Sequence, residues 1–177
     1  MTRRLSLPIT PADHHRGRID APMQLTVYGD YECPYTRRAL IQIRTVREKL
    51  ADDLVVVFRN FPLVEVHPHA MHAARAAEAA AEQGKFWEMH DLLFDHQRAL
   101  TDGDLAGYAR QLGLDEARFE RDRAAEAVLS RIESDVDSGE SSGVKGTPTL
   151  FINGRLHRGS YEASDLIDAL KRSFATP

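Results

Sequence analysis

The sequence is nearly without cysteine, since Cys33 is the only one among its 177 residues. A single cysteine excludes any disulfide bond within the chain. The lack of structural disulfides is compatible with a reducing compartment. Any redox chemistry of this chain therefore depends on one sulfur and on a thiol or disulfide supplied by another molecule.

Long apolar runs are also missing. Residues 1–22 contain two early arginines but no continuous apolar stretch of the length found in a signal peptide. No later segment has enough consecutive apolar residues to span a bilayer. We therefore expect a cytoplasmic chain without membrane insertion.

Positive charge is not in excess either. The formal net charge is -4, and the basic residues are interspersed with acidic ones along the helical stretches. Such a mixture is typical of a solvated helix face and not of a phosphate-binding patch. Internal repeats are absent, and the one biased tract is alanine-rich helix. The sequence therefore argues against nucleic acid or an anionic membrane as a partner.

What remains is the composition of an ordinary globular protein. Apolar residues make up 42% of the sequence and charged residues 28%. The length favours one domain with a sizeable core and an elaboration, and it gives no argument for two independent domains.

Two strands and a helix are predicted in the first third of the chain. Residues 23–30 and 54–61 have strand character, and the second is a continuous apolar run typical of a strand buried on both faces. Between them, apolar residues recur every three or four positions from Ala39 to Leu50, which indicates a helix. Pro34 suits the first turn of that helix. Together these elements predict a parallel βαβ unit.

The middle of the chain, residues 68–143, shows helical periodicity throughout. Gly84 is expected just after the end of the first of these helices. Asp115 is expected to be the N-cap of one long helix that carries an apolar stripe from Phe119 to Val136. This region is predicted to be a helical insertion.

The last part of the chain returns to strand character. Residues 147–152 are expected to form a strand, and Asn153 with Gly154 predicts a type I′ hairpin. A helix over residues 162–174 is expected to close the chain.

Cys33 stands directly before Pro34, at the start of the first predicted helix. The unpaired N–H groups and the positive dipole end of a helix N-terminus stabilise a thiolate over a thiol. Pro34 fixes the first turn, and Tyr31 and Tyr35 can line the sulfur. The alternative is that Cys33 is a small buried apolar residue.

Two acidic residues, Asp30 and Glu32, lie close to Cys33 in sequence. Their carboxylates would oppose a thiolate if they pointed toward the sulfur. The sequence leaves their direction open.

Three histidines, His67, His69 and His72, are spaced in a way that invites a metal interpretation. No carboxylate or thiol of matching spacing accompanies them, and a polar helix start explains them. We therefore expect no metal site.

Two motifs together resemble a known family. The segment YGDYECPYTRRA, residues 28–39, is similar to the active-site segment of the DsbA-like proteins of the thioredoxin superfamily, in which the motif is Cys-Pro-X-Cys. The segment GTPTLFING, residues 146–154, resembles the cis-proline loop of the same superfamily. FRNFPL, HPHAMHAARAAEAA and FWEMHDLLF extend the resemblance over roughly residues 13–174.

The resemblance implies a thioredoxin-like α/β fold with a helical domain inserted before the cis-proline loop. On this basis, residues 1–22 form an extended lead-in, 23–62 and 145–177 the thioredoxin-like domain, and 63–144 the insertion. It also implies an oxidoreductase that acts on protein or peptide thiols and disulfides and needs no cofactor. The site residues it implies are catalytic Cys33 and Thr36, and substrate-binding Pro34, Tyr35, Thr147 and Pro148.

The sequence departs from the family pattern at two positions. Thr36 stands where the family has its second cysteine, and Val27 stands where many relatives carry a buried acid. Both losses remove the means to release a mixed disulfide internally. Cys33 is therefore expected to work as a monothiol that an external thiol such as glutathione releases, with the Thr36 hydroxyl stabilising the thiolate.

Two other functions remain open. The chain can be a non-catalytic thioredoxin-like module that binds an extended peptide or a partner, with a regulatory role, since some relatives are domains of membrane transporters. A glutathione-dependent transferase or isomerase is a third hypothesis, and it requires a glutathione site that the sequence does not identify.

Overall fold

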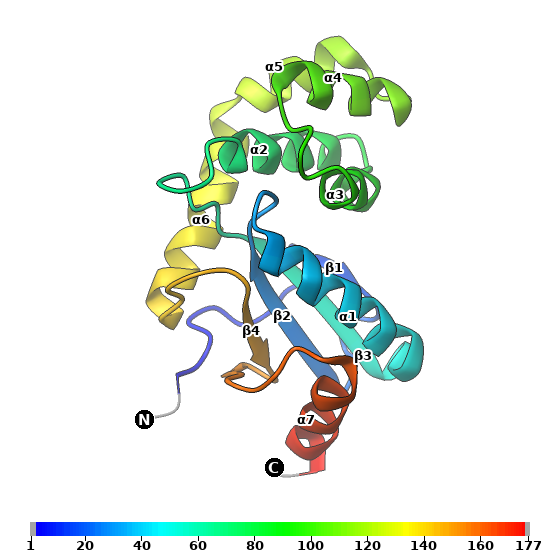
Figure 1. The fold of residues 1–177 in the computed structure, drawn as a ribbon, viewed down its shortest axis with the longest axis vertical. Helices are drawn as coiled ribbons and strands as arrows, with labels where there is room; N and C mark the ends of the chain where they lie inside the picture. The colour runs from blue at the N-terminus through cyan, green and yellow to red at the C-terminus, as the bar shows by residue number, and fades with distance from the viewer. Residues whose placement is uncertain (1–2, 176–177) are drawn as a thin grey trace. The chain divides into compact units, whose positions relative to one another are not determined.

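The computed structural model describes residues 3–175. These residues form a five-stranded sheet and seven α-helices (Figure 1). In chain order the elements are β1 (His14–Arg16), β2 (Met23–Gly29), α1 (Pro34–Leu50), a 3-10 turn (Ala51–Asp53), β3 (Leu54–Asn60), α2 (Ala70–Ala81), α3 (Phe86–Asp95), α4 (Asp102–Gln111), α5 (Glu116–Ala124), α6 (Glu126–Ser142), β4 (Thr149–Ile152), β5 (Arg155–Leu156) and α7 (Ala163–Ala175).

The chain divides into two compact units. The first, called here the sheet unit, comprises the described residues of Met1–Gly29, Tyr35–Arg59 and Asp137–Pro177. The second, called the helical unit, comprises Asp30–Pro34 and Asn60–Val136. The short segment Asp30–Pro34 therefore belongs to the helical unit, although it follows β2 directly and includes the first residue of α1.

The sheet has the strand order β1-β3-β2-β4-β5. The predicted strands at 23–30 and 54–61 are confirmed as β2 and β3, which are neighbours in the sheet and are joined through α1. All seven residues of β3 are buried, as its continuous apolar run predicts. β4 pairs antiparallel with β2, and Leu25 lies opposite Ile152.

The strand β1 adds an edge that the sequence did not predict. Its residues, His14–Arg16, pair antiparallel with β3, and His14 lies opposite Phe58. A stretch of two histidines and an arginine has no apolar alternation, so its strand character comes from pairing with β3 and not from local preference.

The hairpin at Asn153 and Gly154 is confirmed. Both residues have positive φ, 46° and 73°, which a type I′ turn requires at its two central positions. The turn joins β4 to β5, and Ile152 lies opposite Arg155.

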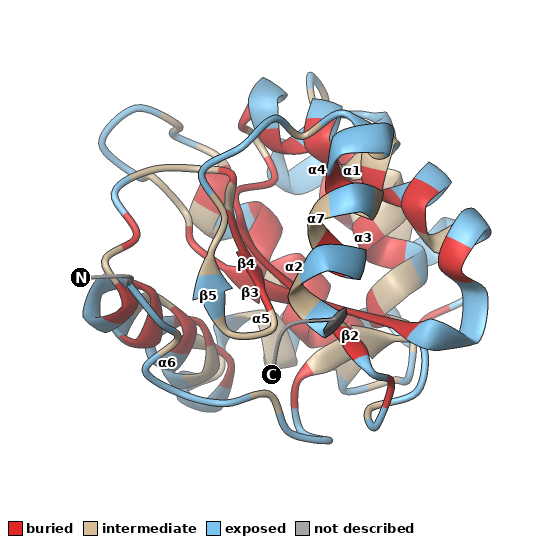
Figure 2. Ribbon diagram, turned by 90° about the horizontal axis from the view of Figure 1, so that it is seen from below, coloured by how far each residue is buried: buried red, intermediate tan, exposed pale blue. Residues whose placement is uncertain are grey.

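Helices α1 and α7 lie on the same face of the sheet (Figure 1). Ala39, Ile43, Val46 and Leu50, which recur along α1, are buried, and Gln42 accepts a hydrogen bond from the backbone N–H of Ala163 at the start of α7. Strands β2, β3 and β4 are almost entirely buried, whereas α1 and α7 each expose one side (Figure 2).

In the helical unit, α2 is rich in buried alanines, whose small side chains let α3 and α5 pack close to it. Asp115 is confirmed as an N-cap, because its side chain accepts a hydrogen bond from the N–H of Arg118 at the start of α5. Thr101 caps α4 in the same way, through a reciprocal capping box with Asp104.

The prediction of one long helix after Asp115 is wrong. The helix ends at Ala124, and Ala125 adopts an extended conformation before α6 begins. No glycine or proline marks this break. The Arg75 side chain of α2 donates a hydrogen bond of 3.0 Å to the carbonyl oxygen of Arg123, which satisfies a group that the broken helix leaves free.

No helix within residues 3–175 combines the length and the apolar composition needed to cross a membrane.

Candidate functional site

Cys33 immediately precedes the first residue of α1, as the sequence predicts. Its backbone N–H donates to the carbonyl oxygen of Asp30 over 3.1 Å, which closes a tight turn between β2 and α1. The residue is 3% exposed. The side chain therefore stands at the N-terminal end of a 17-residue helix, where peptide dipoles favour a negative charge.

Both acidic residues beside Cys33 are bound by histidines of the helical unit. The Asp30 carboxylate lies 2.8 Å from His67 Nδ1 and accepts a hydrogen bond of 2.8 Å from the N–H of Leu63. The Glu32 carboxylate accepts the N–H of His69 over 2.7 Å and lies 3.1 Å from His69 Nδ1. The direction of the two carboxylates, which the sequence left open, is thus set by two histidines.

The segment before Cys33 is also held through its backbone. The Gln97 side chain donates two hydrogen bonds, of 2.7 Å to the carbonyl oxygen of Tyr31 and of 3.0 Å to that of Cys33. The Tyr31 hydroxyl lies 3.0 Å from His90 Nδ1, and its ring packs against Phe94. One amide side chain therefore fixes the carbonyl groups on both sides of Glu32.

Thr36 lies in the first turn of α1 and is fully buried in the sheet unit. Its methyl group packs toward Gly29 at the end of β2: a Cβ atom at Gly29 would be 2.8 Å from the Thr36 methyl and 2.5 Å from the Phe58 ring. Only glycine leaves room for this approach, so Gly29 sets how closely the start of α1 lies on the sheet.

The peptide bond between Thr147 and Pro148 is cis. The Tyr161 hydroxyl donates a hydrogen bond of 3.1 Å to the carbonyl oxygen of Pro148. Burial raises the pKa of Tyr161, which keeps this hydroxyl protonated as a donor.

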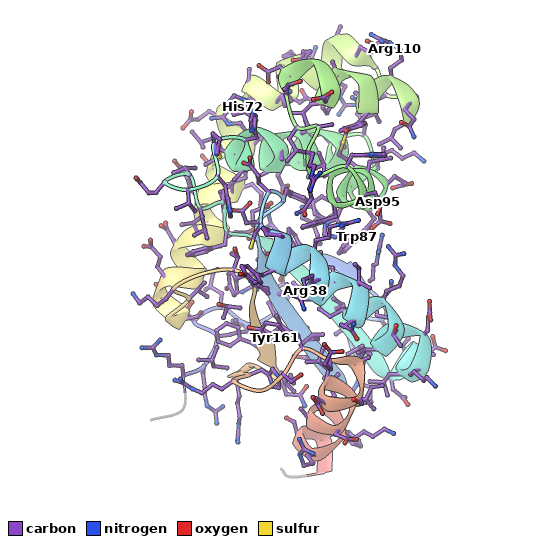
Figure 3. All side chains as sticks on the ribbon, in the orientation of Figure 1. Arg38, His72, Trp87, Asp95, Arg110 and Tyr161 are labelled. Carbon is purple, nitrogen blue, oxygen red and sulfur yellow. The ribbon has the colours of Figure 1, made fainter. Side chains whose placement is uncertain are left out.

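Tyr161 also lines a cavity of about 310 Å³ on the sheet unit. Tyr35, Arg38 and Gln42 of α1 contribute to the same cavity, and Arg38 and Tyr161 are labelled there in Figure 3. Tyr35 is 64% exposed. In the sheet unit, the start of α1 and the cis-proline loop are therefore linked through one tyrosine.

The predicted site residues fall into both units. Cys33 and Pro34 belong to the helical unit, and Tyr35, Thr36, Thr147 and Pro148 belong to the sheet unit. Sequence reasoning did not identify the residues that surround the predicted ones. His67, His69, His90 and Gln97 contact the segment Asp30–Cys33, Tyr161 contacts Pro148, and Gly29 packs close to Thr36. The signal for His67 and His69 was present in the HPHAMH stretch, but their partners are 37 residues away in the chain.

The three clustered histidines pair with three different carboxylates. His67 contacts Asp30, His69 contacts Glu32, and His72 lies 3.3 Å from Asp102. Within residues 3–175, histidine, cysteine and acidic side chains form no group of three or more that could hold a metal ion.

Comparison with known proteins identifies relatives of the whole chain. A family model described as Thioredoxin matches residues 9–172. A protein named Na(+)/H(+) antiporter NhaA 1 from Mycolicibacterium vanbaalenii is 47% identical over 171 residues, which cover 95% of this chain and 28% of that protein. The chain spans about a quarter of the length of the curated relatives it matches.

Two solved structures share the fold. A thioredoxin-like oxidoreductase from Silicibacter pomeroyi superposes with a TM-score of 0.85 at 28% identity and covers 95% of both chains. Pseudomonas aeruginosa DsbA2 superposes with a TM-score of 0.77 at 27% identity, covering 94% of this chain and 97% of the other. The resemblance inferred from the two motifs and the predicted fold class, a thioredoxin-like fold with inserted helices, are thus confirmed.

Proposed function

This chain belongs to the thioredoxin family, and on that premise we propose that it is a DsbA-like thiol-disulfide oxidoreductase that works with one thiol, Cys33. The observation that carries the proposal is the place of Cys33. It directly precedes α1, while the position of the family's second cysteine is occupied by the buried side chain of Thr36.

The exchange proceeds in two steps. The Cys33 thiolate attacks one sulfur of a substrate disulfide, which forms a mixed disulfide with Cys33 and releases the other substrate sulfur as a thiolate that takes up a proton. An external thiol such as glutathione then attacks the mixed disulfide. The substrate leaves as a disulfide with that thiol, and Cys33 returns to the thiolate form.

Substrate recognition involves residues of the sheet unit. The backbone of Thr147 offers hydrogen bonds to an extended peptide, in the manner of an added strand, and cis-Pro148 presents that backbone. Pro34 and the exposed Tyr35, the two residues after Cys33, are proposed to provide apolar contact to the peptide. The Thr36 hydroxyl is proposed to stabilise the thiolate. Protein or peptide disulfides are the proposed substrates, glutathione is the co-substrate, and a reducing compartment such as the cytoplasm would supply it.

Incubation of the protein with oxidised glutathione tests this proposal. We expect intact-mass spectrometry to detect one glutathione adduct per chain, which dithiothreitol removes and Cys33→Ser abolishes. The protein unfolded in urea is the control for access to the sulfur. An adduct that forms in the unfolded chain but never in the folded one would contradict the proposal.

A second variant tests the missing sulfur. Thr36→Cys restores the family motif, and we expect it to form an internal disulfide and to reduce insulin in the presence of dithiothreitol. The matched variant Thr36→Ser keeps the hydroxyl and removes only the methyl, and it should form the glutathione adduct without reducing insulin.

The comparisons also support a second function, a peptide- or partner-binding module without turnover. The supporting observation is that this chain matches only about a quarter of relatives named as Na(+)/H(+) antiporters, so the thioredoxin-like region is one part of those longer proteins. Under this hypothesis Cys33→Ser would bind an extended peptide as tightly as the unchanged protein, as measured by calorimetry.

A further inference from the structure

Each of the three residues before Cys33 contacts a different histidine of the helical unit. Asp30 lies against His67, Tyr31 against His90, and Glu32 against His69. His67 and His69 lie in the segment between β3 and α2, and His90 lies in α3. The segment that presents the sulfur is therefore bordered by groups that can change charge near neutral pH.

The two carboxylates differ in their access to solvent. The side chain of Asp30 is fully buried, and that of Glu32 is 20% exposed. A carboxylate removed from water interacts strongly with nearby charges. Without compensation, these two charges would oppose a thiolate on Cys33, because like charges disfavour each other's ionised form.

The imidazoles of His67 and His69 are placed to compensate these charges. His67 Nδ1 is 2.8 Å and His69 Nδ1 is 3.1 Å from the carboxylate that it contacts. A protonated imidazole forms an ion pair at such distances, whereas a neutral one only donates a hydrogen bond and leaves the negative charge in place.

We propose that His67 and His69 are positioning residues that make thiol-disulfide exchange at Cys33 depend on pH. When protonated they offset the charges of Asp30 and Glu32, which favours the thiolate. When neutral they leave two carboxylate charges in the segment directly before Cys33. This inference rests on the proposed function, because it concerns the rate of that exchange.

Other titratable and charged groups surround this segment. His90 of α3 contacts Tyr31. On α4, hydrogen bonds from Thr101 and, to a smaller extent, the charge of His69 lower the pKa of Asp104. Arg37 and Arg38 follow Cys33 in the sequence, in the first turns of α1. The two histidines are therefore not the only charges near the segment, but they pair directly with its carboxylates.

The test is the pH dependence of the rate at which Cys33 attacks bis(2-hydroxyethyl) disulfide. This disulfide is uncharged at every pH used, so any pH dependence comes from the protein. The double variant H67Q/H69Q replaces both imidazoles with amides that still donate a hydrogen bond but never become charged. We expect it to react about threefold to tenfold more slowly than the unchanged protein at pH 6, and the difference in rate to disappear as the pH is raised to 8.5.

His72→Gln is the matched control. His72 also contacts a carboxylate, Asp102, but that pair is exposed and does not touch the segment before Cys33. Its rate profile should coincide with that of the unchanged protein. An H67Q/H69Q profile that is unchanged, or lower by the same factor at every pH, would overturn the inference, because a purely structural role moves the whole profile.

Glu32→Gln keeps the test decisive if the double variant does not fold. This variant retains an oxygen acceptor for the N–H of His69 and removes one of the two charges, so it should raise the rate at pH 8.5 more than at pH 6. Equal changes at both pH values would contradict the inference. If Cys33 of the unchanged protein reacts at no pH, the proposed function itself fails, and this outcome is distinct from reactivity without the predicted pH dependence.

Discussion

Arg59 and Asn60 are consecutive residues at the end of β3, and the two units bury polar groups around them in different ways. Arg59 belongs to the sheet unit and Asn60 to the helical unit. Around Arg59 every donor has an acceptor and the charge has an opposite partner. Around Asn60 two carboxylates are buried, and the side-chain amide oxygen of Asn60 has no hydrogen-bond partner among the described residues.

The guanidinium of Arg59 makes five hydrogen bonds with its five N–H groups. Two reach the Asp13 carboxylate, at 2.8 and 3.2 Å, and one reaches the Tyr28 hydroxyl at 3.0 Å. The other two reach the carbonyl oxygens of Leu7 and Pro8, each at 3.1 Å. Burial alone would lower the pKa of Arg59, but the hydrogen bonds with Asp13 and Tyr28 raise it overall. The group therefore stays charged at every pH at which the protein folds.

The cluster around Asn60 is less complete. Its backbone N–H donates to the Asp135 carboxylate over 2.9 Å, and its side-chain amide donates to Glu78 over 2.7 Å and to Asp135 over 3.2 Å. The guanidinium of Arg131 lies 3.8 Å from the Asp135 carboxylate, too far for a hydrogen bond. Burial, with a smaller contribution from the charge of Glu78, raises the pKa of Asp135 to about 6, although Arg131 and Asn60 oppose the shift.

Burial by itself therefore does not decide whether a polar cluster responds to pH. The sheet unit holds its charge in a fully satisfied network, whose ionisation is fixed. The helical unit holds two acids of like charge around one amide, so that one of them changes its ionisation between mildly acidic and neutral pH.

The largest expected effect comes from Asp13→Ala in the sheet unit. Removal of the carboxylate leaves the guanidinium of Arg59 buried without its opposite charge, which typically costs about 3 to 5 kcal/mol of unfolding free energy. Urea denaturation followed by circular dichroism measures this loss. Asp20→Ala is the matched control, because Asp20 pairs with Arg18 in an exposed ion pair, and its removal should leave stability unchanged within error. A small effect of Asp13→Ala would show that the network can rearrange.

The next effect is expected at Asp135 in the helical unit. Because its pKa in the folded protein, about 6, lies above that in the unfolded chain, folding favours the protonated acid. The stability contributed by the protonated form is present at low pH and is lost as pH rises through about 4 to 6.

Asp135→Asn cannot ionise and avoids this loss. Its unfolding free energy relative to the unchanged protein should therefore increase by about 2 kcal/mol between pH 4.5 and pH 7. Urea denaturation measures the unfolding free energy of both proteins at each pH. Taking the difference between the two proteins at the same pH removes the contribution of all other acids. A difference that does not change with pH would mean that Asp135 is already ionised at pH 4.5.

The smallest effect is expected from Glu78→Gln. This variant measures how much of the rise in the pKa of Asp135 comes from a like charge. Burial is the largest cause and Glu78 a minor one, so the titration midpoint of Asp135 should fall only slightly and remain above the ordinary value for aspartate. Carbon-13 NMR of the side-chain carboxyl groups measures the midpoint. A return to the ordinary value would make Glu78, and not burial, the main cause.

Much of the fold could be predicted because local signals and tertiary structure agree. The apolar run of β3, the Asn153–Gly154 turn and the N-cap at Asp115 each follow from a few neighbouring residues. The break at Ala125 could not be predicted in this way, because it depends on a hydrogen bond from Arg75, about fifty residues earlier in the chain.

The candidate site shows the same limit. The position of Cys33 before α1 follows from the sequence, since proline favours the first turn of a helix. The directions of Asp30 and Glu32 do not, because they depend on histidines that only the folded helical unit brings close. Local sequence thus locates the sulfur but not the charges around it.

The network of Arg59 has a consequence for how β3 aligns with its neighbours. Sliding a strand by one residue sends every side chain to the opposite face of the sheet. The five residues Leu54–Phe58 are apolar and buried on both faces, so they discriminate poorly between the two alignments. Arg59 does discriminate: on the wrong face its guanidinium would lie on the side of Gly29 and Thr36, away from Asp13. A single charge at the end of the strand therefore specifies the register of the whole strand.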